Sequence, residues 1–324
     1  MRPTGRLHLG HYFGVLVNYL ELQAKHDCFF MIADLHALTT GELAKSNVGA
    51  NSKELLIDFL SVGIDPSKAT LFVQSAVPEH AELFVLLSNL TTMGWLERNP
   101  TYKEQKAELG ENNTNSLGFL GYPVLQTVDV AIYKGTQVPV GEDQKPHLEM
   151  GRELIRRFNT TFGVEVFPEF KPLLTETPKL LGLDRRKMSK SYGNTIELAD
   201  SAETVMKKVK SMITDPDRPR REDPGHPEIC NVFTWHKVFT PKARVLEIEK
   251  QCRLATLSCG DDKIALAERI IEWQKPILAR RKELEKNPDQ LIKIIEEGNQ
   301  KARDVAAKTL NEVRHAMRFW PSRR

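Results

Sequence analysis

The chain has 324 residues, of which 40% are hydrophobic and 27% are charged, and its formal net charge is +3. These values are ordinary for a globular protein of two domains or one large one. The small net charge excludes a polycation, so any nucleic-acid contact must come from local basic patches. We find no apolar run of membrane-spanning length and no secretory signal, and the four cysteines fit a reducing compartment, so we expect a cytoplasmic protein.

The first half of the chain alternates helical patterns with short apolar runs. We expect helices over residues 12–25, 52–61, 79–89 and 143–157, and strands over residues 28–33, 70–75 and 138–140. This alternation predicts an α/β, Rossmann-like domain with a parallel sheet covered by helices. Ligands of such sheets bind at the carboxyl ends of the strands.

The second half of the chain is predicted to be helical and more charged. We expect a basic helix over residues 202–213, a connection rich in Pro and Arg over residues 216–227, and further helices to residue 320. The last helix, residues 289–317, carries an apolar stripe that could dock it back on the first domain. The stripe consists of Ala302, Val305, Ala306, Leu310, Val313 and Met317.

Two short motifs far apart in the sequence indicate a phosphate-binding site. The first, His-Leu-Gly-His at residues 8–11, opens a helix, where the histidines share a face and free N–H groups attract anions. The second, Lys-Met-Ser-Lys-Ser at residues 187–191, offers mobile ammonium groups and hydroxyl donors suited to phosphates. Alone, the first motif would be a helix cap and the second a solvated basic loop. Together they indicate one nucleotide site.

These motifs, the Pro-Thr-Gly turn at residues 3–5 and the Gly-Glu-Asp-Gln stretch at residues 141–144 resemble the signatures of class I aminoacyl-tRNA synthetases. Nearly the whole chain resembles the bacterial tryptophanyl-tRNA synthetases. The resemblance implies an ATP-dependent tryptophan–tRNA ligase, which forms tryptophanyl-adenylate and pyrophosphate and then transfers tryptophan to the 3′ end of tRNA(Trp). It implies ATP with magnesium, L-tryptophan and tRNA(Trp) as partners, a homodimer, and no contact with DNA or membranes.

The resemblance also divides the chain and assigns residues. Residues 1–185 would be the Rossmann-like catalytic domain, residues 186–290 the second motif and a smaller all-helical anticodon-side domain, and residues 291–324 a returning helix. The implied catalytic residues are His8, His11, Lys103, Lys187 and Lys190. The implied ATP-binding residues are Arg2, Pro3, Thr4, Gly10, His11, Gly141, Glu142, Asp143, Leu180, Lys187, Met188, Ser189, Lys190 and Ser191. The implied tryptophan-binding residues are Tyr122, Gln126, Asp129, Val138, Val140 and Gln144.

Asp129 has the chemistry that tryptophan recognition needs. Indole has one hydrogen-bond donor and no acceptor, and the resemblance makes the Asp129 carboxylate its acceptor. A buried acceptor would reject phenylalanine, whereas tyrosine must be excluded by shape, for which Val138 and Val140 are candidate walls. The alternative interpretations are a surface acid or helix cap for Asp129, a plain helix N-terminus for residues 141–144, and an ordinary surface lysine for Lys103.

Cys230, Cys252 and Cys259 resemble three of the four cysteines that hold an iron–sulfur cluster in some tryptophanyl synthetases. The fourth position is Asp262, and a carboxylate is a harder and poorer ligand for such a cluster than a thiolate. A cluster is therefore possible but doubtful, and the alternative is three reduced cysteines. Cys28, in an apolar run, is predicted to lie in the core.

Several basic clusters could neutralise tRNA phosphates. They consist of Lys207, Lys208, Lys210, Arg218, Arg220, Arg221, Arg280, Arg281 and Lys282. Trp235 and His236 are candidates for base stacking, with core packing the favoured interpretation.

The family places a strand before the Pro-Thr-Gly turn, where only Met1 and Arg2 stand here. We expect either a start codon further upstream or a sheet without its first strand. Two other functions stay open, a tyrosyl enzyme and a non-catalytic RNA-binding paralogue. Tryptophan-dependent pyrophosphate exchange into ATP separates them.

Overall fold

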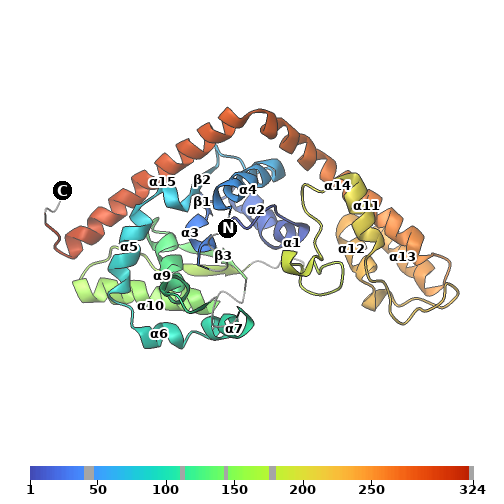
Figure 1. Cartoon of the computed structure of the whole chain (residues 1–324), viewed down its shortest axis with the longest axis horizontal. Helices are drawn as coiled ribbons and strands as arrows, with labels where there is room; N and C mark the ends of the chain where they lie inside the picture. The colour runs from blue at the N-terminus through green and yellow to red at the C-terminus, as the bar shows by residue number, and fades with distance from the viewer. Residues whose placement is uncertain (40–46, 110–113, 142–144, 175–179, 321–324) are drawn as a thin grey trace.

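The protein is described by a computed structural model that covers residues 1–39, 47–109, 114–141, 145–174 and 180–320. Figure 1 shows an arch, in which α14 (Cys259–Lys286) and α15 (Pro288–Ala316) meet at the top. α15 runs along an α/β half on the left, and α14 runs to a helical half on the right. No helix in these described ranges is both long enough and apolar enough to cross a membrane.

The α/β half alternates strands and helices, as predicted from the sequence. Its strands are β1 Cys28–Ile32, β2 Ala69–Val73, β3 Gln137–Val140 and β4 Lys171–Leu174. Its main helices are α4 Val48–Val62, α5 Glu79–Ser88, α6 Met93–Glu97, α7 Pro100–Leu109, α9 Leu117–Ala131 and α10 Lys145–Phe162. Short segments are α1 Leu9–His11, the π-helical η1 Tyr12–Leu16, α2 Val17–Leu22, α3 Asp34–Ala37 and the 3-10 turn η3 Gln74–Ala76.

The strands pair in parallel, which confirms the predicted Rossmann-like α/β class. β1 pairs with β2, and β3 pairs with β4. Along the other edge of β1, the Met1 ammonium donates to the Met31 carbonyl (2.6 Å) and the Ala33 N–H donates to the Met1 carbonyl (2.8 Å). A residue of a parallel strand makes this pair of bonds, so Met1 lies as a strand residue beside β1.

The helical half packs around the end of α14. Its other elements are α11 Ala202–Lys210, the 3-10 turn η6 Pro227–Ile229, α12 Asn231–Phe239 and α13 Lys242–Arg253. Trp235 is fully buried and donates its indole N–H to the Leu181 carbonyl (3.2 Å), and His236 is 1% exposed. Core packing is therefore confirmed for both residues, and the stacking interpretation is wrong. The buried Cys28 lies in the core as predicted.

α15 returns along the α/β half and packs against the edge of β2. The apolar stripe residues Ala302, Ala306, Leu310 and Val313 are buried in one cluster with side chains of α5, α9 and α10. The Asn299 side chain accepts the N–H of Val73 at the end of β2 (2.9 Å). This contact satisfies a backbone donor that an uncovered edge strand would leave without a protein partner.

The close approach of α15 to β2 depends on Gly298. A Cβ on Gly298 would lie 1.7 Å from the Leu71 carbonyl oxygen, which belongs to a paired strand and cannot turn aside. We expect Gly298→Ala to lower the free energy of unfolding by about 1–3 kcal/mol or more through overpacking. Gly94→Ala in α6 is the control, because no atom outside its own helix lies within 4 Å of that Cβ. Thermal unfolding followed by circular dichroism measures both, and a Gly298→Ala midpoint equal to that of the wild type would contradict this packing.

Candidate active site

The two phosphate motifs lie together in the structure. The backbone of Leu9 donates to Ile196 (2.9 Å), and that of Leu198 donates to Leu7 (2.8 Å). These bonds join the start of the chain to the segment that follows the second motif. Lys190 then reaches back across this junction and donates its Nζ to the Thr4 carbonyl (3.1 Å). Side chains from the two motifs therefore share one site.

His8 and His11 form a reciprocal cap at the start of α1. Each Nδ1 accepts the backbone N–H of the other residue (3.3 Å), and the rings stack with centroids 3.6 Å apart. Burial, with the nearby Lys190 charge, lowers the pKa of His8 to about 4. Burial, with His8 and Lys190, lowers the pKa of His11 to about 3. Both rings are therefore neutral at pH 7. Because Nδ1 accepts, the proton resides on Nε2, which gives each ring one donor for a ligand oxygen.

Gly10 lets these rings pack against the second motif. A Cβ on Gly10 would lie 3.0 Å from His8 Nδ1 and 3.2 Å from Met188 Cβ. The Gly10 N–H points at the Met188 sulfur (3.2 Å), and Met188 is 6% exposed. The sequence suggested that Gly10 makes room for a nucleotide. In the structure, the room beside its Cα is taken by His8 and Met188.

Asn194, which follows the second motif in the chain, holds the backbone of that motif in place. Its side chain accepts the N–H of Ser189 (2.8 Å) and donates to Asp184 (2.7 Å) and to the Lys187 carbonyl (3.1 Å). A Cβ on Gly182 would lie 2.3 Å from the Asn194 amide nitrogen, so this contact also requires a glycine. The loop therefore holds its shape through one buried amide.

Asp58 of α4 anchors the first motif from below. It is 1% exposed and accepts the Leu7 N–H at Oδ2 (2.7 Å) and Arg281 Nη1 at Oδ1 (2.7 Å). Arg281 lies on α14, is 4% exposed and also pairs with Glu54. The prediction that Arg281 contacts RNA is therefore wrong, because its guanidinium is buried among carboxylates. Arg280 beside it donates to the Ser61 carbonyl.

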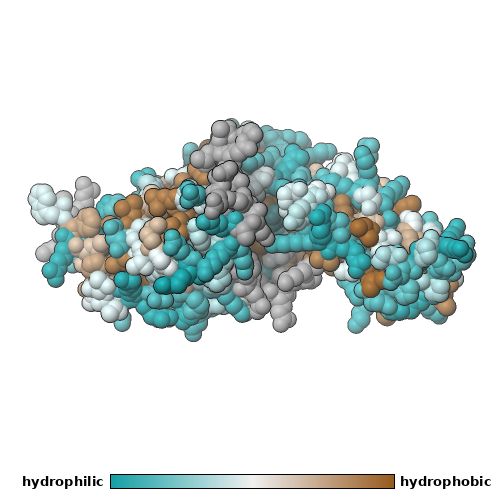
Figure 2. Space-filling view, turned by 60° about the horizontal axis from the view of Figure 1, so that its bottom comes forward, coloured by the Kyte–Doolittle hydropathy of each residue, from teal (hydrophilic) through white to brown (hydrophobic). Residues whose placement is uncertain are grey.

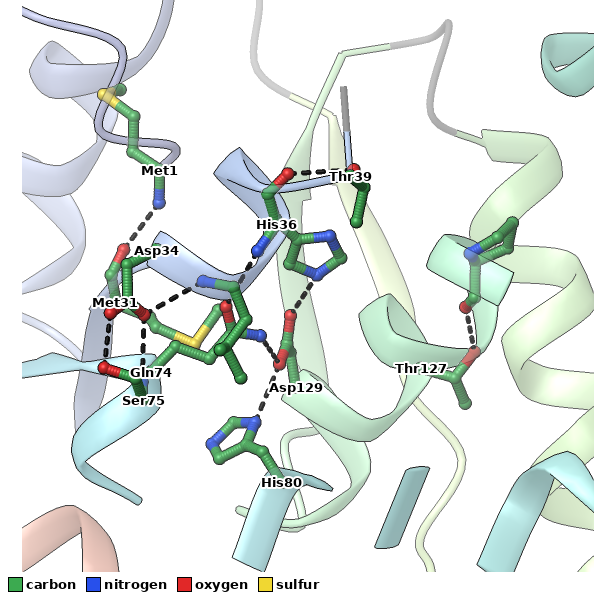
Figure 3. Close-up of polar contacts among 12 residues, drawn as sticks. Met1, Met31, Asp34, His36, Thr39, Gln74, Ser75, His80, Thr127 and Asp129 are labelled. Atoms are coloured by element: carbon green, nitrogen blue, oxygen red, sulfur yellow. Dashed lines mark hydrogen bonds and ion pairs between the residues drawn. The ribbon is translucent and has the colours of Figure 1, made fainter. Parts of the chain in front are cut away.

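Asp129 lies at the carboxyl ends of β1 and β2, where its side chain is 10% exposed (Figure 3). His36 Nε2 lies 2.7 Å from its Oδ2, and Gln74 Nε2 (2.7 Å) and His80 Nδ1 (2.8 Å) lie near its Oδ1. Burial alone would raise the pKa of Asp129, but the charge and hydrogen bonds of His36 and His80 outweigh burial and hold the pKa well below its usual range. The interpretation of Asp129 as a surface acid or cap is wrong.

The other predicted site residues differ in how far they are buried. Tyr122, half-buried on α9, hydrogen-bonds His147 Nε2 (2.6 Å), and Gln126, Val138 and Val140 are half-buried. Ser189 and Ser191 hydrogen-bond each other (2.9 Å), Pro3 is buried, and Leu180 lies in the core at 7% exposure. Arg2, Thr4, Lys103, Gly141 and Lys187 are exposed. Glu142, Asp143 and Gln144 lie outside the described residues.

Two of the residues predicted for an iron–sulfur cluster have other neighbours in the structure. Asp262 belongs to the first turn of α14 and lies 3.2 Å from His236 Nε2, while Cys259 accepts Arg218 Nη1 at 3.6 Å. Within the described ranges, no three His, Cys, Asp or Glu side chains are arranged to hold a metal ion. A cluster needs several thiolates directed at one point, and the described residues give no support for such an arrangement.

Sequence reasoning missed His36, Gln74 and His80 around Asp129, and Asp58 and Arg281 beneath the first motif. A signal for the first group existed, because His36 lies in the short helix after β1 and Gln74 comes directly after β2, at the carboxyl ends of parallel strands. No local pattern marks the second group, since Asp58 and Arg281 come from two helices far apart in the chain.

A parallel α/β half that carries these two motifs at one edge is the architecture expected of class I tRNA synthetases. A family model described as tRNA synthetases class I (W and Y) matches residues 1–274. The chain is 44% identical to a tryptophan–tRNA ligase of Aquifex aeolicus (98% of both chains) and 46% identical to one of Thermotoga maritima (98% of this chain, 97% of the relative). It thus belongs to the class I tRNA synthetases.

Within that class, the chain belongs to the tryptophan–tRNA ligase family. A crystal structure of the tryptophanyl-tRNA synthetase of Campylobacter jejuni, complexed with ADP and tryptophan, superposes with a TM-score of 0.90 at 33% identity, and the match covers 98% of each chain. A tyrosyl-tRNA synthetase of Archaeoglobus fulgidus reaches a TM-score of 0.63 at 21% identity, which shows a shared fold alone.

The two motif histidines make stability depend on pH. The unfolded chain binds protons at these imidazoles near pH 6.5, and the folded chain binds them only near pH 4 and pH 3. Because the unfolded state takes up protons first, stability should fall as pH drops from about 6.5 toward 4, by up to about 1.4 kcal/mol per pH unit for each histidine.

We expect the double substitution His8→Asn, His11→Asn to remove this part of the slope. Urea unfolding at pH 7, 6 and 5 measures it, with His26→Asn as the control at an exposed histidine. An unchanged slope in the double variant would show that the two rings are not buried as neutral groups.

Proposed function

We propose that this chain is a tryptophan–tRNA ligase. It activates L-tryptophan with ATP to tryptophanyl-adenylate and pyrophosphate, and then transfers tryptophan to the 3′ end of tRNA(Trp). The observation that carries the proposal is the meeting of neutral His8 and His11 with the Lys190 ammonium at one edge of an α/β half. The full-length similarity to tryptophan–tRNA ligases supports the same reaction.

In the activation step, a tryptophan carboxylate oxygen attacks the α-phosphorus of ATP and the bond to the bridging oxygen of pyrophosphate breaks. Negative charge builds up on the leaving β- and γ-phosphates. The Nε2–H groups of His8 and His11 and the Nζ of Lys190 are the donors proposed to stabilise this charge. Burial lowers the pKa of Lys190, and Glu197 and Asp58 oppose that effect. A partly desolvated ammonium exerts a stronger field on phosphates than one in water.

ATP would enter as its magnesium complex, with the ion held by the phosphates. Of the other residues assigned to ATP by resemblance, Thr4, Met188 and Ser189 lie at the junction of the two motifs, which supports their roles. Lys103 is exposed and Leu180 lies in the core, so their roles rest on the resemblance alone.

Tryptophan would bind beside Asp129, with Tyr122 and Gln126 one or two turns earlier on α9. Val138 and Val140 of β3 are half-buried, as pocket walls would be. The Asp129 carboxylate is ionised and held by three donors, so it is ready to accept an indole N–H. A tyrosine hydroxyl could also donate, so discrimination against tyrosine must come from the shape of this pocket.

The tRNA would lie along the helical half. Lys207, Lys210, Arg220 and Arg221 are exposed there, whereas Lys208 pairs with Asp200 (2.6 Å) and Arg218 donates to backbone carbonyls. Exposed cations attract phosphates without reading bases. We also propose that the chain divides into a catalytic domain of residues 1–185, an anticodon-side domain of residues 186–290 and a returning helix of residues 291–324.

We also propose a homodimer formed through the α/β half. Val85 (58% exposed), Met93 (56%) and Leu117 (76%) lie on α5, α6 and α9 of that half. Figure 2 shows hydrophobic surface over the α/β half on the left. Large exposed apolar side chains on neighbouring helices are typical of an interface between subunits.

The three cysteines of the helical half are proposed to be reduced thiols rather than ligands of an iron–sulfur cluster.

Pyrophosphate exchange into ATP tests the activation step. We expect exchange that depends on tryptophan and is about 100-fold slower with tyrosine at equal concentration, since discrimination by the shape of an apolar pocket reaches about 10- to 200-fold. Exchange with tyrosine alone would identify a tyrosyl enzyme. Exchange with neither amino acid would favour a non-catalytic protein and contradict the proposal.

Lys190 should act on the reaction more than on ATP binding. We expect Lys190→Ala to lower the rate of tryptophan activation by about 100-fold, since a lost donor to developing charge costs that much, while the KM for ATP changes by less than about threefold. Lys207→Ala is the matched control, because Lys207 is an exposed lysine of α11 and the assay contains no tRNA. Equal losses in rate and in ATP affinity would mean that Lys190 binds phosphate in the ground state only.

A further inference from the structure

The two carboxylate oxygens of Asp129 are bound differently. Oδ1 lies near two donors, Gln74 Nε2 (2.7 Å) and His80 Nδ1 (2.8 Å), and the residues that supply them are fully buried. Among the described residues, Oδ2 lies near one donor, His36 Nε2 (2.7 Å), and the His36 side chain is 11% exposed. Figure 3 shows these donors approaching from α3, the end of β2 and α5. The Oδ2 side therefore faces the more open part of the site.

The donors at Oδ1 are themselves fixed. His80 Nε2 lies 2.7 Å from the Tyr133 hydroxyl. A carboxylate oxygen can only accept, so His80 donates from Nδ1, and the Tyr133 hydroxyl is the partner of its other ring nitrogen. The Tyr133 ring stacks on Phe29 of β1 with centroids 4.8 Å apart. The Gln74 side-chain oxygen Oε1 accepts the backbone N–H of His36 (3.4 Å). Neither donor can leave Oδ1 without breaking a second buried hydrogen bond.

We propose that Oδ2 of Asp129 is the oxygen that accepts the indole N–H of tryptophan, and that His80 and Gln74 are positioning residues that lock Oδ1 so that Oδ2 faces the amino acid. This inference rests on the proposed function. A carboxylate oxygen has two lone-pair positions. At Oδ1 both are filled, whereas at Oδ2 one remains beside that used by His36.

The lock matters because specificity for an N–H requires an acceptor that cannot turn away. A freely rotating carboxylate would bond water or a neighbouring donor when the ligand lacks an N–H, and little discrimination would remain. A locked carboxylate leaves a buried acceptor unpaired in that case, which is the penalty that selects tryptophan. His80 and Gln74 would thus determine specificity without touching the substrate, and Tyr133 would orient His80.

The test compares tryptophan with β-(3-benzothienyl)alanine, in which a sulfur atom replaces the indole N–H. We expect His80→Leu to lower kcat/KM for tryptophan by about 10- to 100-fold in pyrophosphate exchange, the size expected for a hydrogen bond to a charged group. The loss should lie mainly in KM, because the indole bond is made equally in the ground and transition states. The values for the analogue and the KM for ATP should change by less than about threefold.

Two variants separate positioning from structure. His80→Asn should restore most of the preference for tryptophan, because the Asn amide nitrogen can take the place of Nδ1. Ser61→Ala, which removes a buried hydrogen bond far from Asp129, should leave the ratio of the two substrates unchanged. If His80→Leu does not fold, as judged by its thermal unfolding midpoint, Gln74→Met carries the same test at the other donor.

Equal losses for tryptophan and the analogue, or no loss for either, would overturn the positioning role while leaving the proposed function intact. Failure of the proposed function gives a different result, since the wild-type protein would then show no tryptophan-dependent exchange at all.

Discussion

The site depends on how the backbone of residues 7–9 is held. This stretch has little regular structure of its own, yet in the proposed mechanism it presents two imidazoles to a phosphate chain. Its buried N–H and carbonyl groups find partners in Asp58, Ile196 and Leu198. A buried donor left without a partner costs about 1–3 kcal/mol, so each bond resists displacement of the stretch. Arg281 in turn neutralises Asp58, which makes α14 part of the support.

A second support of the same kind operates around Asp129. Both sites place an ionised carboxylate under several buried donors, and in both the donors come from distant segments that only the folded chain brings together. Asp58 fixes the backbone at Leu7, whereas the Asp129 carboxylate is itself fixed by the donors around it. Buried polar groups of this kind are costly unless every member is satisfied, so they favour one arrangement over its alternatives. These buried hydrogen bonds therefore hold the candidate site residues in fixed positions relative to the α/β half.

Sequence patterns predicted the elements better than the contacts. The strands β1, β2 and β3 followed from apolar runs, and α4 and α15 from helical spacing, because burial on one face imposes those periods. The proximity of residues 8–11 and residues 187–191 could be predicted, because both motifs carry side chains suited to binding phosphate. The roles of His36, His80 and Arg281 could not be predicted, since the sequence around a histidine or arginine looks the same whether the side chain is exposed or buried. Only tertiary structure shows that Arg281 faces Asp58 instead of RNA.

The central claim is that the first and second motifs surround a single triphosphate. A crystal structure of the protein with a non-hydrolysable ATP analogue tests it most directly. The account predicts that Nε2 of at least one of His8 and His11, together with Nζ of Lys190, lies within about 3.2 Å of oxygens of the same phosphate chain. A nucleotide bound to one motif only, with the other more than about 6 Å away and bridged by no water, would contradict it.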